Sequence, residues 1–119
     1  MLDGSRVLIA CGDGEAGLHI ASAFALVQAR VIGPVLVGEQ ALAEIDHLRP
    51  DALVVEPTGN GPGLIPLLER ALREGIPTVI CAEPGLLPEF RGRHPFLSVL
   101  QSPCRPLRLV GEVAVLLAA

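Results

Sequence analysis

The 119-residue chain has no lysine, tryptophan or tyrosine, so arginine supplies all nine of its basic residues. Without lysine, the chain cannot form a Schiff base with a carbonyl substrate or build a P-loop, which binds phosphates through a lysine. Its three phenylalanines are too few for the stacking platforms of proteins that bind single-stranded nucleic acids. The formal net charge of -4 and the lack of clustered arginines also argue against a nucleic-acid partner.

Long hydrophobic runs are missing as well. Hydrophobic residues make up 50% of the chain, but no run approaches the roughly 20 residues that span a bilayer. The first six residues lack the basic-then-apolar order of a signal peptide. We therefore expect a soluble cytoplasmic protein without membrane contact, in which residues 1–119 form one domain with a sizeable core.

The three cysteines, Cys11, Cys81 and Cys104, form an odd number and contain no C-x-x-C spacing. This pattern is typical of a reducing compartment and predicts small buried residues or incidental thiols. A metal or redox site near the strand ends is the alternative, but no local pair of ligands supports it. We expect no bound metal.

An apolar run in the middle of the chain organises the predicted fold. It covers residues 52–55, follows Arg49-Pro50, and ends at Glu56 before a loop rich in Pro, Gly and Asn. This pattern predicts a central parallel strand that delivers Glu56 to the carboxyl edge of a sheet. Sites in open α/β sheets form at that edge, so we expect the chemistry of the protein to gather around Glu56.

Four further apolar segments, at 6–11, 31–37, 76–82 and 96–100, read as strands. Helical patterns are found in four places: after Gly14, over 39–48, from Leu64 to Leu72, and from Pro106 onward. In 83–95, prolines and glycines allow at most a short or distorted helix. Gly33-Pro34 favours an edge position for the second strand. The alternation predicts a flavodoxin-like α/β fold: a five-stranded parallel sheet of order 2-1-3-4-5 with helices on both faces.

A glycine fingerprint lies between the first strand and the first helix. Gly12, Gly14 and Gly17 have the G-x-G-x-x-G spacing, and Glu39 follows the second strand. In dinucleotide-binding proteins such glycines let backbone amides approach a pyrophosphate, and the acid binds the ribose. The pattern predicts a small nucleotide- or dinucleotide-binding regulatory domain. The alternative is an ordinary tight connection between a strand and a helix.

A second pattern covers nearly the whole chain and resembles the receiver domain of bacterial response regulators. Its motifs are weak singly but specific in their order and spacing: Arg6-Val7-Leu8-Ile9, Val31-Ile32-Gly33-Pro34, Glu39-Gln40-Ala41-Leu42, Leu48-Arg49-Pro50-Asp51, Gly75-Ile76-Pro77, Leu87-Pro88-Glu89-Phe90-Arg91 and Val99-Leu100-Gln101-Ser102-Pro103. We prefer this interpretation. It implies a domain of two-component, phosphorelay signal transduction.

The positions that carry receiver chemistry are altered. The acidic pair that holds Mg²⁺ in the family falls on Cys11 and Gly12, with only Asp13 beside them, and the phosphate-accepting aspartate falls on Glu56. Further matches put Ala82 at the Thr/Ser position, Ser102 at the lysine position and Val99 at the switch aromatic. The resemblance therefore implies a degenerate receiver.

Phosphoryl transfer to a carboxylate needs cations that offset the repulsion between negative groups. This chain offers one acid, no lysine and a longer nucleophile, so we expect no phosphorylation by the usual route, no cofactor and no enzymatic activity. Glu56 would then imitate a phosphoaspartate, with Arg105 as its cationic partner. The alternative is a solvated acid at a strand end.

The resemblance implies protein partners: a histidine kinase, an output domain or another signalling protein. In receivers the fourth helix, fifth strand and fifth helix form the contact face, which includes the position of Val99. In the last helix, Leu109 and Leu116 extend the apolar arc to one side of the core stripe. This predicts a homodimer or partner contact through that helix, with a wide core face as the alternative.

An enzyme remains a third hypothesis. Glu56, Asp13 and Cys11 would form an acid/base and thiol cluster in one pocket. This hypothesis requires that the three side chains converge and that a nearby helix N-terminus favours the thiolate form of Cys11.

Overall fold

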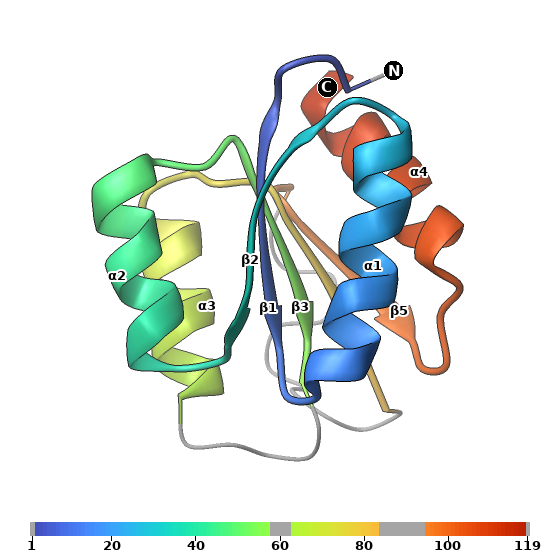
Figure 1. Cartoon of the computed structure of the whole chain (residues 1–119). Coiled ribbons are helices and arrows are strands. Elements are labelled where there is room, and N and C mark those ends of the chain that lie inside the picture. The colour runs from blue at the N-terminus through green and yellow to red at the C-terminus, as the bar shows by residue number, and fades with distance from the viewer. Residues whose placement is uncertain (1, 58–62, 84–94, 119) are drawn as a thin grey trace.

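The computed structural model describes residues 2–57, 63–83 and 95–118, and it contains a five-stranded parallel sheet of order β2-β1-β3-β4-β5 (Figure 1). The strands are β1 (Arg6–Cys11), β2 (Arg30–Leu36), β3 (Ala52–Glu56), β4 (Thr78–Ala82) and β5 (Leu97–Gln101), and the helices are α1 (Gly14–Leu26), α2 (Glu39–Leu48), α3 (Leu64–Arg73) and α4 (Pro106–Ala118). The predicted strand order and flavodoxin-like architecture are confirmed.

Successive residues of each central strand point to opposite faces of the sheet, and both faces are covered. Val7 and Ile9 of β1 join a core cluster with α1 and α4, whereas Leu8 and Ala10 join a second cluster with α2 and α3. Figure 1 shows these two helix pairs on opposite sides of the sheet. A residue's place in its strand therefore decides which helix pair it meets.

Several local predictions hold. Helix α2 has the predicted bounds, and a helix follows the first strand from Gly14 as predicted, with Ile20 and Phe24 buried in the core. Gly75, at φ 69°, follows the end of α3, where a left-handed backbone favours glycine. The expected helix in 83–95 falls almost wholly outside the described residues, as does the resemblance motif at 87–91.

Strand β2 lies at an edge of the sheet, as its Gly33-Pro34 step predicted. The pairing of β1 with β2 shifts register between Leu8 and Ala10, opposite this step. Proline has no N–H to donate, so a central strand would lose a ladder hydrogen bond here. The edge position removes that conflict.

The expected exposed flank of α4 is wrong at Leu109, which is only 1% exposed and belongs to the α1/α4 core cluster. Leu116 is partly buried against the same cluster. Together with Val110 and Val113 they form one broad apolar arc, so the wide core face is the correct interpretation. The large apolar side chains of α4 that are exposed are Leu107 and Val115, at 67% and 65% exposure.

Cys11 and Cys81 are buried as expected, but the cysteines are not all free thiols. Cys81 and Cys104 form a disulfide across 23 residues of sequence, with their Cα atoms 6.3 Å apart, and Cys11 is a free, buried thiol. The fold brings the end of β4 next to the chain that follows β5, a proximity that no local spacing signals. No helix in the described part of the chain has both the length and the apolar character of a membrane span.

Candidate functional site at the carboxyl edge of the sheet

Glu56 is the last residue of β3 and pairs in register with Cys11, the last residue of β1. Its backbone carbonyl accepts a hydrogen bond of 2.8 Å from the N–H of Gly12. Glu56 lines a pocket of about 230 Å³ on the side of α1 and α4. The other described residues of this Glu56 pocket are Ala16, His19, Ile20, Cys81, Ser102, Pro103, Cys104, Pro106 and Leu109.

The carboxylate of Glu56 is poorly compensated. Its Oε1 is buried and has no hydrogen-bond partner within the described residues, so Glu56 is not a simple solvated acid. Burial raises the pKa of Glu56, and the negative charge of Asp13 raises it further. The pocket therefore disfavours the charged form of this side chain.

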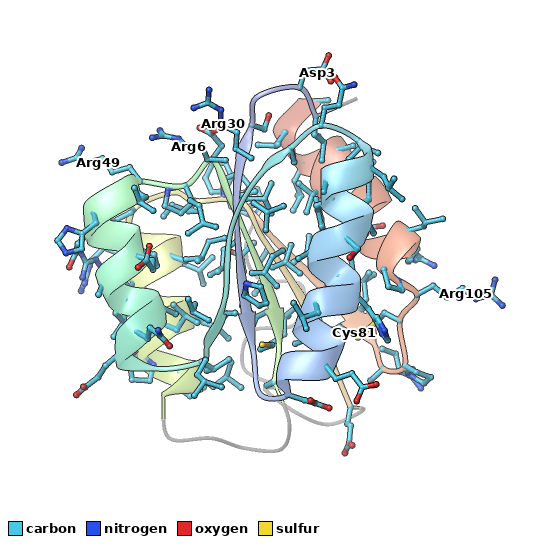
Figure 2. All side chains as sticks on the ribbon, in the orientation of Figure 1. Asp3, Arg6, Arg30, Arg49, Cys81 and Arg105 are labelled. Atoms are coloured by element: carbon cyan, nitrogen blue, oxygen red, sulfur yellow. A yellow bond between two sulfur atoms is a disulfide. The ribbon has the colours of Figure 1, made fainter. Side chains whose placement is uncertain are left out.

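Arg105 does not neutralise Glu56. It lies in the connection between β5 and α4, is exposed, and points away from the molecule in Figure 2. It lines a separate pocket of about 440 Å³ with Leu100, Gln101, Pro103, Cys104 and Arg108. The expected pairing of Arg105 with Glu56 is therefore wrong, because the two side chains face different pockets.

Asp13 has a structural role at this edge. It is the N-cap of α1, and its Oδ1 accepts a hydrogen bond of 2.9 Å from the N–H of Glu15. A side-chain oxygen at this position satisfies an N–H that the helix itself leaves unpaired. One oxygen of the Asp13 carboxylate is thus engaged by the helix backbone.

Cys11, the last residue of β1, packs its side chain against α1 near Gly17, and its Sγ lies 3.5 Å from the carbonyl oxygen of Val35. Burial raises the pKa of the Cys11 thiol, and the charges of Glu56 and Asp13 raise it further. The enzyme hypothesis needed a thiolate at this point, and the surroundings favour the protonated thiol instead. Glu56, Asp13 and Cys11 are close together, but their electrostatics oppose nucleophilic catalysis.

The donor set does not suit a divalent cation either. Mg²⁺ requires hard oxygen ligands, and the matched positions supply a thiol and a glycine. Within the described residues, no group of three His, Cys, Asp or Glu side chains could hold a metal ion. Charge compensation by a bound metal is therefore not built into this edge.

Ala82 and Ser102 lie at the same edge as Glu56. The N–H of Ser102 donates a 2.8 Å hydrogen bond to the carbonyl of Ala82, and the Ser102-Pro103 peptide is cis. Ser102 lines the Glu56 pocket, whereas Ala82 is buried in the α2/α3 cluster. Val99 is partly buried and packs against the same α2/α3 cluster. This edge thus presents the hydroxyl of Ser102 to the Glu56 pocket and keeps the methyl of Ala82 in the core.

The glycine fingerprint does not converge on one site. Gly12 and Glu39 line a pocket of about 640 Å³ between β1, α2 and α3, but Gly14 and Gly17 are not among its described residues. A Cβ on Gly17 would lie 2.6 Å from Sγ of Cys11, whereas one on Gly14 would meet nothing within 4 Å. Gly17 is therefore required for packing α1 against β1.

Among the residues of the Glu56 pocket, sequence reasoning gave no role to His19, and it considered the cysteines for a metal or redox site near the strand ends without pairing Cys81 with Cys104. His19 precedes the core residue Ile20 by one position and lies three after Ala16, so helical spacing could have placed it toward the strand ends. His47 is exposed on α2, and His94 lies outside the described residues. The cysteine pair gave no signal before the tertiary fold.

No protein-family model matches the chain. No curated protein matches its sequence either. Solved structures do resemble it. The chemotaxis response regulator CheY4 of Vibrio cholerae matches with a TM-score of 0.74 and 15% identity, over 95% of this chain and 98% of that one. This is the fold of response-regulator receiver domains. A receiver protein from Sinorhizobium medicae gives a TM-score of 0.72 and 21% identity, covering 100% of this chain and 98% of its own.

A receiver fold also occurs in proteins described as pseudo-receivers. The pseudo-receiver domain of the CikA protein matches with a TM-score of 0.67 and 17% identity, over 95% of this chain and 97% of that one. Such low identities establish the fold alone. The chemistry must therefore be argued from the residues at the strand ends.

Proposed function

We propose that the chain is an atypical receiver domain of a bacterial two-component, phosphorelay system that acts in the cytoplasm through protein contacts. It is not phosphorylated by the usual route and has neither an enzymatic activity nor a cofactor. Its partner is a histidine kinase, an output domain or another signalling protein.

The environment of Glu56 carries this proposal. A phosphorylated carboxylate needs cations around it, yet the pocket already disfavours the single charge of Glu56. Phosphorylation would add further negative charge beside Asp13, in a chain without lysine whose described residues contain no group of three His, Cys, Asp or Glu side chains that could hold a metal ion. The receiver fold without the receiver electrostatics favours a binding role.

The decisive test is intact-mass spectrometry and thermal denaturation of the chain with Mg²⁺ plus acetyl phosphate, or Mg²⁺ plus beryllofluoride. We expect neither a phosphoryl adduct nor a shift in melting temperature. CheY4 of Vibrio cholerae, treated identically, is the positive control for the reagents. A phosphoryl adduct on Glu56 would overturn the proposal.

A nucleotide-binding regulatory domain is the second candidate, because Gly12 and Glu39 line the same 640 Å³ pocket. The Asp13 carboxylate opposes it, since it occupies the N-terminus of α1, where a pyrophosphate would bind. Titration with NAD(H) and ATP under the same thermal assay separates the candidates. Saturable stabilisation that Glu39→Gln weakens would support nucleotide binding and would reject the protein-only scaffold.

A further inference from the structure

The Cys81–Cys104 disulfide joins two elements at the rim of the Glu56 pocket. Cys81 lies in β4 and is 5% exposed, within the α1/α4 core cluster. Cys104 lies in the connection from Ser102 to Arg105, between the end of β5 and the start of α4. Both cysteines line the Glu56 pocket. The bond therefore ties the chain that leads into α4 to the central part of the sheet.

A backbone hydrogen bond also joins this connection to β4. The N–H of Ser102 donates to the carbonyl of Ala82 at 2.8 Å. Sγ of Cys104 lies 3.2 Å from the carbonyl oxygen of Gln101. A disulfide sulfur carries no proton, whereas a Cys104 thiol would donate a hydrogen bond to that carbonyl. The reduced form thus has an acceptor already in position.

The two sulfurs differ in access. Cys81 is buried, whereas Cys104 is partly exposed and also lines the 440 Å³ pocket that contains Arg105 and Arg108. An attacking thiolate would reach Cys104 first. Both arginines are exposed, and Figure 2 shows Arg105 directed to solvent. Nε of Arg108 lies 3.9 Å from Oε1 of Glu112, which offsets part of its charge, whereas Arg105 extends into solvent. The approach to Cys104 therefore carries the charge of Arg105 and a partly compensated Arg108, on a protein whose formal net charge is -4.

We propose that Cys81–Cys104 is a reversible thiol–disulfide exchange site for anionic thiols of the glutathione class, which dock against Arg105 and Arg108, and that reduction releases the 102–105 connection from β4. This redox role is additional to the proposed protein-binding function, and the exchange chemistry does not depend on that function. The arginines select the thiol, and the disulfide controls the rim of the Glu56 pocket.

The exchange takes place in two balanced steps. A thiolate attacks Sγ of Cys104, the S–S bond breaks, and its electron pair leaves on Cys81, which takes up a proton. A second thiolate attacks the sulfur of the bound thiol, the mixed disulfide bond breaks, and Cys104 leaves as a thiolate that takes up a proton. The sum converts the protein disulfide and two thiols into two cysteine thiols and the disulfide of the reagent.

The first test equilibrates the folded chain in buffers of reduced and oxidised glutathione and stops the exchange with acid. It then labels every free thiol, including the buried ones, with N-ethylmaleimide in denaturant and measures intact mass. We expect a reversible change from one to three labelled cysteines, with Cys11 as the constant thiol. A Cys11→Ser variant should change from none to two. The proposal fails if the pair stays unlinked in excess oxidised glutathione, or if it can be reduced only after denaturation.

The second test compares reduction rates with mercaptoethanesulfonate, which is anionic, and cysteamine, which is cationic, at low ionic strength. The R105E/R108E double variant should lower the anionic-to-cationic rate ratio by about 3-fold or more. The R49E/R73E double variant makes the same change in net charge away from this pocket and should leave the ratio unchanged. An unchanged ratio in R105E/R108E would overturn the selection of anionic thiols.

A third measurement tests the structural consequence. Amide hydrogen exchange in residues 102–110 should be faster in the reduced chain and in Cys104→Ser than in the oxidised chain, with β1 and β3 unaffected. If the three proteins exchange alike in this segment, the disulfide does not control the connection. If β1 and β3 also lose protection, the disulfide has a global stabilising role and the proposed local release is wrong.

Discussion

At the scale of single residues, the surroundings of the Glu56 side chain disfavour its charged form. Glu56 occupies a strand end, its buried Oε1 has no hydrogen-bond partner among the residues that the structure describes, and Asp13 is the neighbouring charge. Glu56 also adjoins Cys11, whose thiol is itself kept protonated by burial and by these two acids. Charge at this edge therefore opposes folding, and the pH of the solution should show it.

The pH dependence of Glu56→Gln tests this electrostatic picture. The pKa of Glu56 is raised in the folded state, so its favourable contribution is complete below the unfolded value of about 4.3 and is lost as pH rises through the folded value. Glutamine cannot ionise. The variant should therefore gain melting temperature over the wild type at pH 7, and this gain should shrink toward pH 4.

Glu69→Gln is the matched control, because Glu69 is exposed on α3. It should change stability little at either pH. A Glu56→Gln variant that is less stable than wild type at pH 7, with the difference vanishing at pH 4, would mean that a cation compensates Glu56.

At the scale of elements, α1 sits against β1 through Gly17. A Cβ there would approach both Sγ of Cys11 and, at 2.8 Å, Cβ of Pro34. The glycine spacing that resembles a nucleotide fingerprint thus has a packing cause at its third position. The broad apolar arc of α4 likewise has a packing role, because its residues belong to the core cluster shared with α1.

Gly17→Ala should destabilise the fold by about 1–3 kcal/mol, as overpacking does in a close-packed core. Gly14→Ala adds the same methyl in open space within the same helix, and should be neutral or stabilising by up to about 1 kcal/mol. Urea denaturation measures both. Cys11→Ala should relieve part of the Gly17→Ala effect, because it removes the nearer obstacle. Equal effects of the two glycine substitutions would refute the packing role.

In α4, Leu109→Ala should cost about 2–5 kcal/mol of stability, because it empties a buried site. Leu107→Ala, two residues earlier on the exposed side, should cost less than about 0.5 kcal/mol. Chemical denaturation of the two variants compares them directly. Similar losses would contradict the observed orientation of α4.

At the scale of the whole molecule, the two faces of the sheet are covered by two helix pairs, and the remaining apolar surface of α4 faces solvent. Leu107 and Val115 lie eight residues apart and are both exposed. No charged residue follows Glu112 on this helix. The expected homodimer or partner contact through the last helix therefore shifts from Leu109 and Leu116 to this outer side.

Sedimentation equilibrium tests the homodimer. If two copies associate through α4, L107E/V115E should abolish a concentration-dependent dimer and leave the melting temperature of the monomer nearly unchanged. The double variant L18E/L26E places the same charges on exposed leucines of α1 and should leave association intact. A chain that stays monomeric at every concentration would leave a different protein as the partner of this surface.

The sequence by itself determined the strands, most helix bounds and the strand order, because hydrophobic period and Pro/Gly punctuation are local properties. It also determined that Glu56 would end the central strand, since a carboxylate cannot continue a strand buried on both faces. The helices could be placed because their apolar period and the flanking Pro and Gly residues are also local features.

Only the tertiary structure decided how side chains from distant segments meet. It paired Cys81 with Cys104, turned Arg105 away from Glu56, put Leu109 into the core and gave Gly17 a packing role. Each of these depends on the register of β4 with β5 or on the rotation of a helix about its axis. A single sequence constrains these quantities weakly, because a small rotation exchanges buried and exposed positions without changing the apolar pattern.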